Sequence, residues 1–303
     1  MKRRGFLGVG GAALAQASAS AAAPVEGVRG RAARPGARRR WGLALGSGSV
    51  HGLAHIGVLR ALERLGASPD VIAGTSAGAI VGALAAARVP VADAEAIARE
   101  LDWASVGRLT LPWKGLMRND ALQKRIDEAV RGRPIEALPT PFCAVATDLL
   151  DGRSVLLRSG PTGLAVGASS SIPVLFEPLR VGGRDLVDGS LVAPVPVDAV
   201  RAMGPQFVVA IDVAYRPHDE LPRGIGDIAF QMMHVMVNAL IDEQLRRADF
   251  ALRIELHHLM LGEWNADVLI REGERATLQA WPQLRERFAA AGIDAGVGGA
   301  KPP

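Results

Sequence analysis

The sequence has 303 residues, 49% of them apolar, so the chain is long enough for a large hydrophobic core in one domain or two. Its single cysteine, Cys143, excludes an intrachain disulfide and a multi-cysteine metal site, and its apolar neighbours favour a buried small hydrophobe. The net charge of +4 is unevenly placed, because residues 1–40 carry a net +8 and the remainder a net −4. This distribution argues against a nucleic-acid-binding body.

The first 40 residues have the pattern of a leader and a linker. Residues 1–23 begin with a basic segment, continue with small apolar residues and end in A-x-A sites, which predicts an export signal. The paired Arg3 and Arg4 resemble a twin-arginine address, so we expect an exported, periplasmic protein. Residues 24–40 are basic and lack apolar periodicity, which predicts a disordered linker. Contact between this segment and an anionic membrane surface is an open alternative.

From Trp41 onwards, short apolar runs alternate with longer helical patterns. The pattern predicts, in chain order, a strand at 41–46, a helix at 52–65, a strand at 70–73, a helix at 77–88, a mainly helical segment at 92–131, strands at 141–149 and 154–158, a helix at 161–170, a strand pair at 179–189, a strand at 206–213 and a helix at 226–249. Such alternation is typical of an α/β fold with a largely parallel, helix-covered sheet. We expect one domain, residues 41–292, followed by a flexible tail, residues 293–303, and we assign no element between 250 and 292.

The predicted helix at 226–249 carries an apolar stripe on one face. The stripe comprises Ile228, Met232, Val235, Met236, Ala239 and Leu240. Packing against the core is the preferred interpretation, and contact with acyl chains or a membrane surface is the alternative.

A candidate nucleophile lies in the stretch Gly74-Thr75-Ser76-Ala77-Gly78, which has the form G-x-S-x-G. The outer glycines allow the backbone to pass closely on both sides of a sharp strand-to-helix turn, which holds the serine hydroxyl at the end of the sheet. The stretch follows a predicted strand and precedes a predicted helix, as this mechanism requires. The free N–H groups of the helix start would also stabilise negative charge.

A serine nucleophile needs a base, and the body offers histidines and aspartates. Asp188 is distinguished by its setting, because an apolar strand delivers its carboxylate onto a turn at Gly189. Asp151, in contrast, stands between two short strands of a predicted hairpin, where an ordinary turn residue is expected.

A glycine-rich loop with Gly46, Gly48 and Gly52 connects the first predicted strand to the first predicted helix. Loops of this kind hold either phosphates or the oxyanion of an acyl transfer. The spacing is G-x-G-x-x-x-G rather than the dinucleotide-binding G-x-G-x-x-G, and Asp70 stands at the start of the next strand rather than at its end. This spacing argues against a dinucleotide site, and the glycines by themselves leave the role of the loop open.

Six blocks carry a resemblance to a known family: ALGSGSVHGLAHIGVLRAL, AGTSAG, VATDLLDGRSV, ASSSIPVLFEP, LVDGSLVAPVPVDAVRAMG and VVAIDV. In this order, over about residues 41–215, they resemble the patatin-like phospholipases, particularly the compact bacterial members. The resemblance implies a three-layer α/β/α sandwich and hydrolysis of acyl esters in lipids, without metal or cofactor. It implies a dyad with Ser76 as nucleophile and Asp188 as base, and, by position, Gly48 and Ser49 as oxyanion donors. The supporting motif positions are Gly46, His51, Gly52, Gly74, Gly78 and Gly189.

His51 departs from the family pattern, in which the loop usually ends in arginine or lysine followed by glycine. A histidine supplies positive charge near the oxyanion only when it is protonated, and its reference pKa is about 6.5. We therefore expect reduced or pH-dependent activity, and we expect His51→Arg to raise the rate of hydrolysis. An unchanged or lower rate would count against a charge role at this position.

Three other interpretations stay open. A Ser–His–Asp hydrolase would use Ser76, Asp188 and either His218 or His234. A metal site would use His51 and His55, although the glutamate of H-E-x-x-H is missing. A binding protein with an idle dyad is supported only by the departure at His51.

Overall fold

The computed structural model describes residues 39–100, 108–109, 115–214, 224–256 and 265–294. The described elements belong to one compact unit, residues 32–303. The predicted export signal, nearly all of the linker, His218 and residues 295–303 lie outside the described residues.

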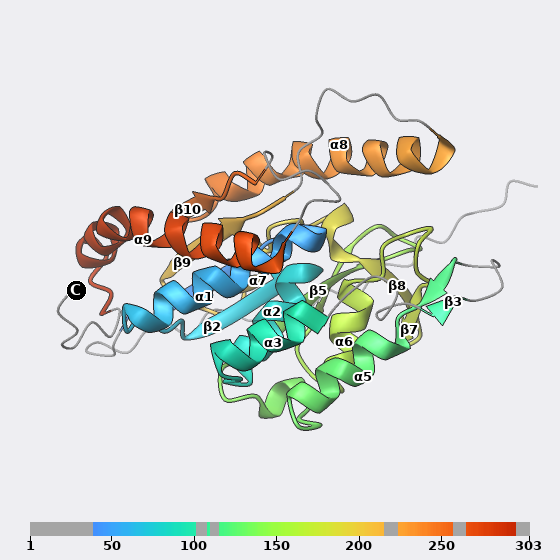
Figure 1. Ribbon diagram of the computed structural model, residues 1–303, viewed down its shortest axis with the longest axis horizontal. Coiled ribbons are helices and arrows are strands. Elements are labelled where there is room, and N and C mark those ends of the chain that lie inside the picture. The colour runs from blue at the N-terminus through green and yellow to red at the C-terminus, as the bar shows by residue number, and fades with distance from the viewer. Residues whose placement is uncertain (1–38, 101–107, 110–114, 215–223, 257–264, 295–303) are drawn as a thin grey trace, which may run out of the picture. The chain divides into compact units, whose positions relative to one another are not determined.

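A mixed sheet forms the centre of the fold, with the strand order β10-β9-β1-β2-β5-β8-β7 and with β6 paired to β5 (Figure 1). Its strands are β1 (Trp41–Leu45), β2 (Val71–Thr75), β5 (Phe142–Asp148), β6 (Ser154–Leu157), β7 (Leu179–Val181), β8 (Arg184–Asp188), β9 (Phe207–Asp212) and β10 (Phe250–Arg253). The five strands from β10 to β5 are parallel, whereas β6, β7 and β8 join by antiparallel pairing. The predicted hairpin turns at 151–152 and 182–183 are present, and Gly152, Gly182 and Gly183 have positive φ angles.

The central strands are apolar on both faces because helices cover both sides of the sheet. In β1, Leu43 and Leu45 enter one hydrophobic cluster and Ala44 enters the other. In β9, Phe207 and Val209 likewise face one cluster, and Val208 faces the opposite one. This is the physical reason why these strands read as continuous apolar runs in the sequence.

The helices form the two outer layers of a three-layer sandwich (Figure 1). One layer contains α1 (Ala54–Arg64), α2 (Ala77–Ala86), α3 (Val91–Glu100), α5 (Asp120–Ala129), α6 (Thr162–Ser169) and α9 (Ala266–Ala290). The other contains α7 (Val197–Arg201) and α8 (Ile225–Arg246). Short helical turns occur at η1 (Ser49–Leu53), η2 (Ile135–Ala137) and η3 (Gly189–Leu191). The segment predicted as mainly helical is divided, because β3 (Arg108–Leu109) pairs with β4 (Met117–Arg118) between α3 and α5.

The longest helix, α9, was not predicted from the sequence. Its buried positions recur at helical spacing, at Leu269, Ile270, Gly273, Thr277, Trp281, Leu284 and Phe288. Charged residues fill the remaining faces, and Pro282 interrupts the pattern inside the helix. The helix packs against α1 in backbone contact, because a Cβ on Gly57 would lie 1.9 Å from the carbonyl oxygen of Ile270.

The apolar stripe of α8 does not pack into the core, so the preferred interpretation of that stripe was wrong. Met232, Val235 and Met236 are 59%, 56% and 57% exposed. The helix is instead anchored by Val237 and Ile241, which face the sheet. Within the described residues, no helix is both long and apolar enough to cross a bilayer.

The folded body reaches slightly beyond both predicted limits of the domain. Arg39 forms a parallel bridge with Ile293, and its guanidinium donates to the carbonyl oxygen of Ala291 at 2.8 Å. Ile293 is buried, although the sequence placed it in the flexible tail. The backbone N–H of Arg40 donates to Gln206 at 2.8 Å.

Candidate active site

Ser76 occupies a sharp turn between β2 and α2. Its backbone has φ 54° and ψ −122°, a conformation that L residues rarely adopt and that the surrounding packing must hold in place. The flanking glycines allow this turn, since a Cβ on Gly74 would lie 2.2 Å from the carbonyl oxygen of Gly78. A Cβ on Gly78 would lie 2.1 Å from the carbonyl oxygen of Leu45. The side chain of Ser76 therefore projects from the end of the sheet.

Asp188 is brought to Ser76 by the way in which two strands share β5. Parallel β2 pairs with the first part of β5, where Thr75 lies opposite Val145. Antiparallel β8 continues along the same edge of β5, where Asp188 lies opposite Ala146. The carboxyl ends of β2 and β8 therefore meet at adjacent residues of one strand. The hydroxyl of Ser76 donates a hydrogen bond to Oδ2 of Asp188 at 2.6 Å.

The carboxylate of Asp188 is held by several other groups. Its Oδ1 accepts from the backbone N–H of Ser190 at 2.8 Å, and its own N–H donates to the carbonyl oxygen of Ser171 at 2.8 Å. The hydroxyl of Thr147 donates to its carbonyl oxygen at 2.8 Å. Gly189 is required beside it, because a Cβ there would lie 2.1 Å from the carbonyl oxygen of Val145.

Burial makes the carboxyl of Asp188 less acidic than an ordinary aspartate. The residue is only 1% exposed, and this desolvation raises the pKa of its carboxyl; the hydrogen bonds from Ser76 and Ser190 lower it by less. A carboxylate with a raised pKa is a better proton acceptor, as a base working on a serine hydroxyl requires.

The glycine-rich loop leaves two backbone N–H groups available beside Ser76. Three other N–H groups of the loop are used: Gly46 donates to Ile211 at 3.0 Å, Ser47 to Pro194 at 2.8 Å and His51 to Gly48 at 2.9 Å. Across the residues that the structure describes, no acceptor binds the N–H of Gly48 or of Ser49. Both residues line the same small cavity as Ser76 and Asp188.

Close packing fixes the path of this loop. A Cβ on Gly48 would lie 2.7 Å from Cγ2 of Val213, and a Cβ on Gly52 would lie 2.2 Å from Cβ of Ala77. Ser49 has a φ of 51°, again in the left-handed region. The loop and the turn of Ser76 therefore touch each other directly.

The two histidines of the loop region are both buried. Burial lowers the pKa of His55 to about 4, so its ring is neutral at pH 7 and its Nε2–H donates to the carbonyl oxygen of Gly46 at 2.8 Å. This bond occupies one of the two ring nitrogens through which His55 could bind a metal. His51 is only 2% exposed, so an arginine at this position would have to place its charge in a desolvated environment. Among the described residues, no group of three or more His, Cys, Asp or Glu could hold a metal ion.

Helix α8 contributes side chains to the cavity that were not identified as site residues from the sequence. Phe230, Met233, His234 and Val237 line it from this helix, and Ser47, Ile172, Ser190 and Ala214 line it from the loops. Only His234 was considered, as a triad member, and burial lowers its pKa. The hydroxyl of Ser76 donates its hydrogen bond to Asp188.

A second group of polar residues, which was not identified from the sequence, holds the turn of Ser76. Ser169 accepts from the backbone N–H of Ser76 at 3.0 Å and donates to the carbonyl oxygen of Val145 at 2.5 Å. The side chain of Thr75 donates to the carbonyl oxygen of Ala193 at 2.7 Å. The available signal was the run Ser169-Ser170-Ser171, an unusual concentration of hydroxyls at the end of an apolar helix.

Comparison with known proteins gives consistent matches. The family model of patatin-like phospholipases matches residues 43–201. An uncharacterized NTE family protein of Mycobacterium tuberculosis is 38% identical over 178 residues, which cover 57% of this chain and 49% of the relative. Lysophospholipase NTE1 of Coccidioides immitis is 33% identical over 214 residues, which cover 69% of this chain and 14% of the relative. Patatin-like phospholipase domain-containing protein 6 of Mus musculus is 33% identical over 189 residues, which cover 59% of this chain and 14% of the relative.

Among solved structures, VipD of Legionella pneumophila aligns with a TM-score of 0.49 at 12% identity, covering 82% of this chain and 67% of VipD. The chain spans about half or less of the length of the curated relatives described above. The matched family segment begins in β1, includes the glycine-rich loop, Ser76 and Asp188, and ends in α7. This chain belongs to the patatin-like phospholipase family.

Proposed function

We propose that this protein is a serine acyl hydrolase that cleaves ester bonds of lipids through a Ser76–Asp188 dyad. The observation that carries the proposal is the 2.6 Å hydrogen bond from the hydroxyl of Ser76 to the buried carboxylate of Asp188. Family membership and the lysophospholipase among the relatives support a lipid ester as the substrate.

The first half of the reaction acylates the enzyme. Asp188 takes the proton of Ser76 as the serine oxygen bonds to the ester carbonyl carbon, which gives a tetrahedral oxyanion. The N–H groups of Gly48 and Ser49 and the start of α2 stabilise that charge, and each backbone donor supplies about 3 kcal/mol. The intermediate then breaks its bond to the alcohol, which leaves with the proton from Asp188, and an acyl-enzyme remains.

The second half repeats these steps with water. Asp188 removes a proton from a water molecule as its oxygen attacks the acyl carbon, and the same two amides hold the second oxyanion. The bond to Ser76 then breaks, the serine oxygen regains the proton from Asp188, and the fatty acid is released. The cycle needs no group other than the chain and water.

Labelling with a serine-reactive fluorophosphonate tests the nucleophile. We expect the wild-type protein to be labelled between about pH 5 and about pH 9, and Ser76→Ala to lose the label completely. Absence of Ser76-dependent labelling over this range would favour the binding-protein alternative. His234→Ala should keep the label; if it loses the label while it stays folded, a Ser–His–Asp triad replaces the dyad.

The pH dependence of hydrolysis follows from the acidity of Asp188. Only the ionised carboxylate accepts a proton, so activity should fall as the pH drops through the pKa of Asp188. Because burial raises this pKa, the acid limb of kcat/KM should lie above the ordinary range of an aspartate. A profile measured on a soluble short-chain ester checks this. An acid limb at or below the reference value would contradict a raised pKa at the base.

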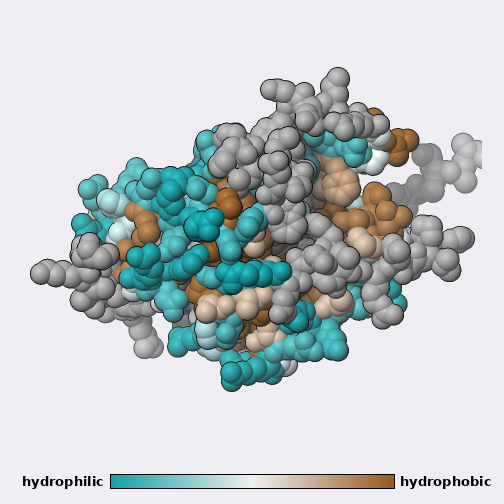
Figure 2. Space-filling view, in the orientation of Figure 1, coloured by the Kyte–Doolittle hydropathy of each residue, from teal (hydrophilic) through white to brown (hydrophobic). Residues whose placement is uncertain are grey.

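We further propose that the protein acts at a lipid surface, with α8 as the contact element. The outer side of α8 exposes Ile225, Ile228, Met232, Val235 and Met236. Its inner side lines the cavity of the dyad through Phe230, Met233 and Val237. Hydrophobic side chains are visible at the end where this helix begins (Figure 2).

The size of the cavity supports the same proposal. It measures about 50 Å³, far below the roughly 300–1,000 Å³ of ordinary small-molecule sites. An acyl chain must therefore displace side chains of α8 to reach Ser76. Burial of the outer face of α8 in lipid would offset the cost of this rearrangement, at about 25 cal/mol per Å² of apolar surface.

The contact is tested with vesicles of phosphatidylcholine. Met232→Glu should lower vesicle binding and the hydrolysis of vesicle lipid by roughly tenfold or more, because it places a charge on the apolar face. Hydrolysis of a soluble short-chain ester should stay within about twofold of wild type, since Met232 does not line the dyad cavity. Gln283→Glu, an exposed change on α9 with the same added charge, is the matched control. Equal binding by the two variants would contradict a role for α8.

A further inference from the structure

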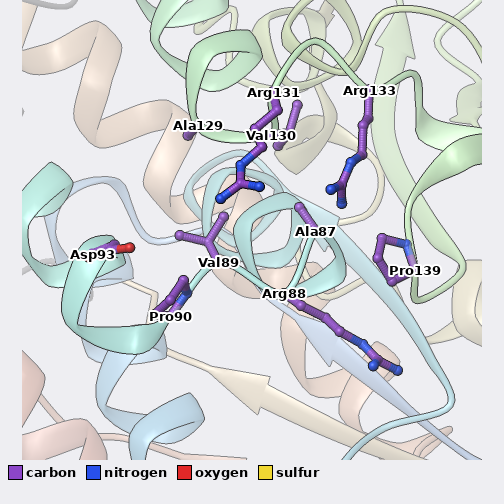
Figure 3. A pocket seen from close by; sticks show the side chains of 10 residues that line it. All are labelled: Ala87, Arg88, Val89, Pro90, Asp93, Ala129, Val130, Arg131, Arg133 and Pro139. Carbon is purple, nitrogen blue, oxygen red and sulfur yellow. The ribbon is translucent and has the colours of Figure 1, made fainter.

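A second cavity of about 320 Å³ lies away from the dyad and is lined by three arginines, Arg88, Arg131 and Arg133 (Figure 3). The guanidinium groups of Arg131 and Arg133 point into the space over Ala87 and Val89. Throughout the described part of the chain, no carboxylate or carbonyl oxygen pairs with any of these three side chains. Some other arginines of the fold pair with acids, as Arg99 pairs with Asp267 and Arg253 with Asp212.

Two of these arginines occupy backbone positions at which glycine is usually found. Helix α2 ends in a Schellman motif, because Val89 donates to the carbonyl oxygen of Leu84 at 3.0 Å and Arg88 donates to that of Ala85 at 3.0 Å. Such a motif places its C′ residue in the left-handed region, where glycine is preferred. Here the C′ residue is Arg88, with a φ of 56°.

Helix α5 ends in the same way. Gly132 donates to the carbonyl oxygen of Asp127 at 2.7 Å, and Arg131 donates to that of Glu128 at 3.1 Å. The C′ residue is Arg131, with a φ of 59°. Both helices therefore carry an arginine where the backbone favours glycine, and both arginines line the same cavity.

Two other helices of this chain end in Schellman motifs that use glycine. Gly66 follows α1 with a φ of 67°, and Gly292 follows α9 with a φ of 63°. At these two helix ends the chain therefore meets the backbone requirement with glycine. The helix dipole does not explain why arginine replaces glycine after α2 and α5. A cation at any position of the last turn interacts favourably with the dipole, and most of those positions do not require a positive φ.

We propose that this cavity binds a phosphate-type anion, such as a small phosphomonoester. Planar guanidinium groups are the preferred partners of phosphate oxygens because they donate two parallel hydrogen bonds. Arg131 and Arg133 point into the cavity, whereas the guanidinium of Arg88 points away from them (Figure 3), and Asp93 is the one carboxylate among the described residues that line it. The floor formed by Ala87, Val89 and Val130 suits a small apolar group attached to the phosphate.

The site is separate from the catalytic one. Helix α2 begins after Ser76 and ends beside this cavity, and its ten residues span about 15 Å. An anion bound there touches neither the dyad nor the oxyanion loop. Its binding is therefore independent of hydrolysis and of the function proposed above.

Calorimetric titration with inorganic phosphate and with glycerol 3-phosphate tests the proposal, in low salt and in the Ser76→Ala protein. We expect binding that weakens with added salt and falls at least tenfold in Arg131→Gly/Arg133→Ala. Arg153→Ala, an exposed arginine outside the cavity, should bind like the parent. A third arm uses phosphatidylcholine vesicles with and without phosphatidate. Vesicle binding that requires both phosphatidate and the arginines would assign the anion to a lipid headgroup.

A thermal measurement separates this role from a purely structural one. Glycine fits the left-handed C′ position better than arginine, so Arg131→Gly should keep or raise the melting temperature while it weakens anion binding. A clear fall in melting temperature with unchanged anion binding would make Arg131 a helix cap and overturn the proposal. Absence of binding in all three arms, or equal binding by the cavity variants and Arg153→Ala, would overturn it as well.

Discussion

Replacing Asp188 with asparagine is expected to lower kcat/KM for ester hydrolysis by roughly 10³–10⁴-fold. The amide keeps the shape of the side chain and can still accept from the N–H of Ser190, but it cannot take a proton from Ser76. Ser76 then loses the only base in direct hydrogen-bond contact with it among the described residues. Hydrolysis of a soluble short-chain ester, measured well above the acid limb, gives the size of the loss.

The same substitution should leave the protein at least as stable as wild type. Burial raises the folded-state pKa of Asp188, so the folded protein holds this proton more tightly than the unfolded chain does. The ionised carboxylate therefore reduces the free energy of unfolding as the pH rises through the unfolded and then the folded pKa. A neutral amide removes this cost at about pH 8, which urea unfolding of both proteins measures.

Asp185→Asn is the matched control, because Asp185 lies on the same strand but is half-exposed and pairs with Arg180. It should retain wild-type activity. If Asp188→Asn loses activity only in step with a loss of folded protein, the effect is structural. If it hydrolyses the ester at the wild-type rate, Asp188 is not the base.

Replacing Gly273 with alanine is expected to lower the free energy of unfolding by about 2–3 kcal/mol. The new Cβ would lie 1.9 Å from the carbonyl oxygen of Ala54, so α9 must move away from α1. The gain in helix propensity from glycine to alanine, about 1 kcal/mol, is smaller than this cost. A domain of this size should lose roughly 5–10 °C in melting temperature.

Gly226→Ala in α8 is the control for Gly273→Ala. No atom lies within 4 Å of a Cβ at Gly226, so alanine there should be neutral or stabilising by up to about 1 kcal/mol. If Gly273→Ala is as stable as the wild-type protein, the backbones of α1 and α9 are not in close contact in solution.

The sequence predicted well those elements whose signal is local. The apolar runs of β1 and β9 stand between glycine and polar residues, and the turn at Gly182 and Gly183 requires positive φ angles that glycine adopts freely. The candidate nucleophile was found for the same reason, because the turn at Ser76 needs small residues at fixed positions on both sides.

Elements whose signal depends on a distant partner were missed or misassigned. The apolar positions of α9 are buried because the helix packs against α1. Gly273 allows a close backbone contact with Ala54 and does not form a turn. The stripe of α8 has the periodicity of a core helix, but periodicity does not say which side of a helix meets the sheet. Val237 and Ile241 pack against the sheet, whereas Met232 and Met236 are exposed.

The residue types of the candidate site can be recognised in the sequence: a serine in a glycine-flanked turn, an aspartate after an apolar strand, and a glycine-rich loop. The tertiary structure is needed to bring Ser76 and Asp188 into contact, because 112 residues separate them and the contact depends on two strands that pair with one edge of β5. It also decided the acidity of Asp188, since desolvation is a property of the packed environment and not of the residue.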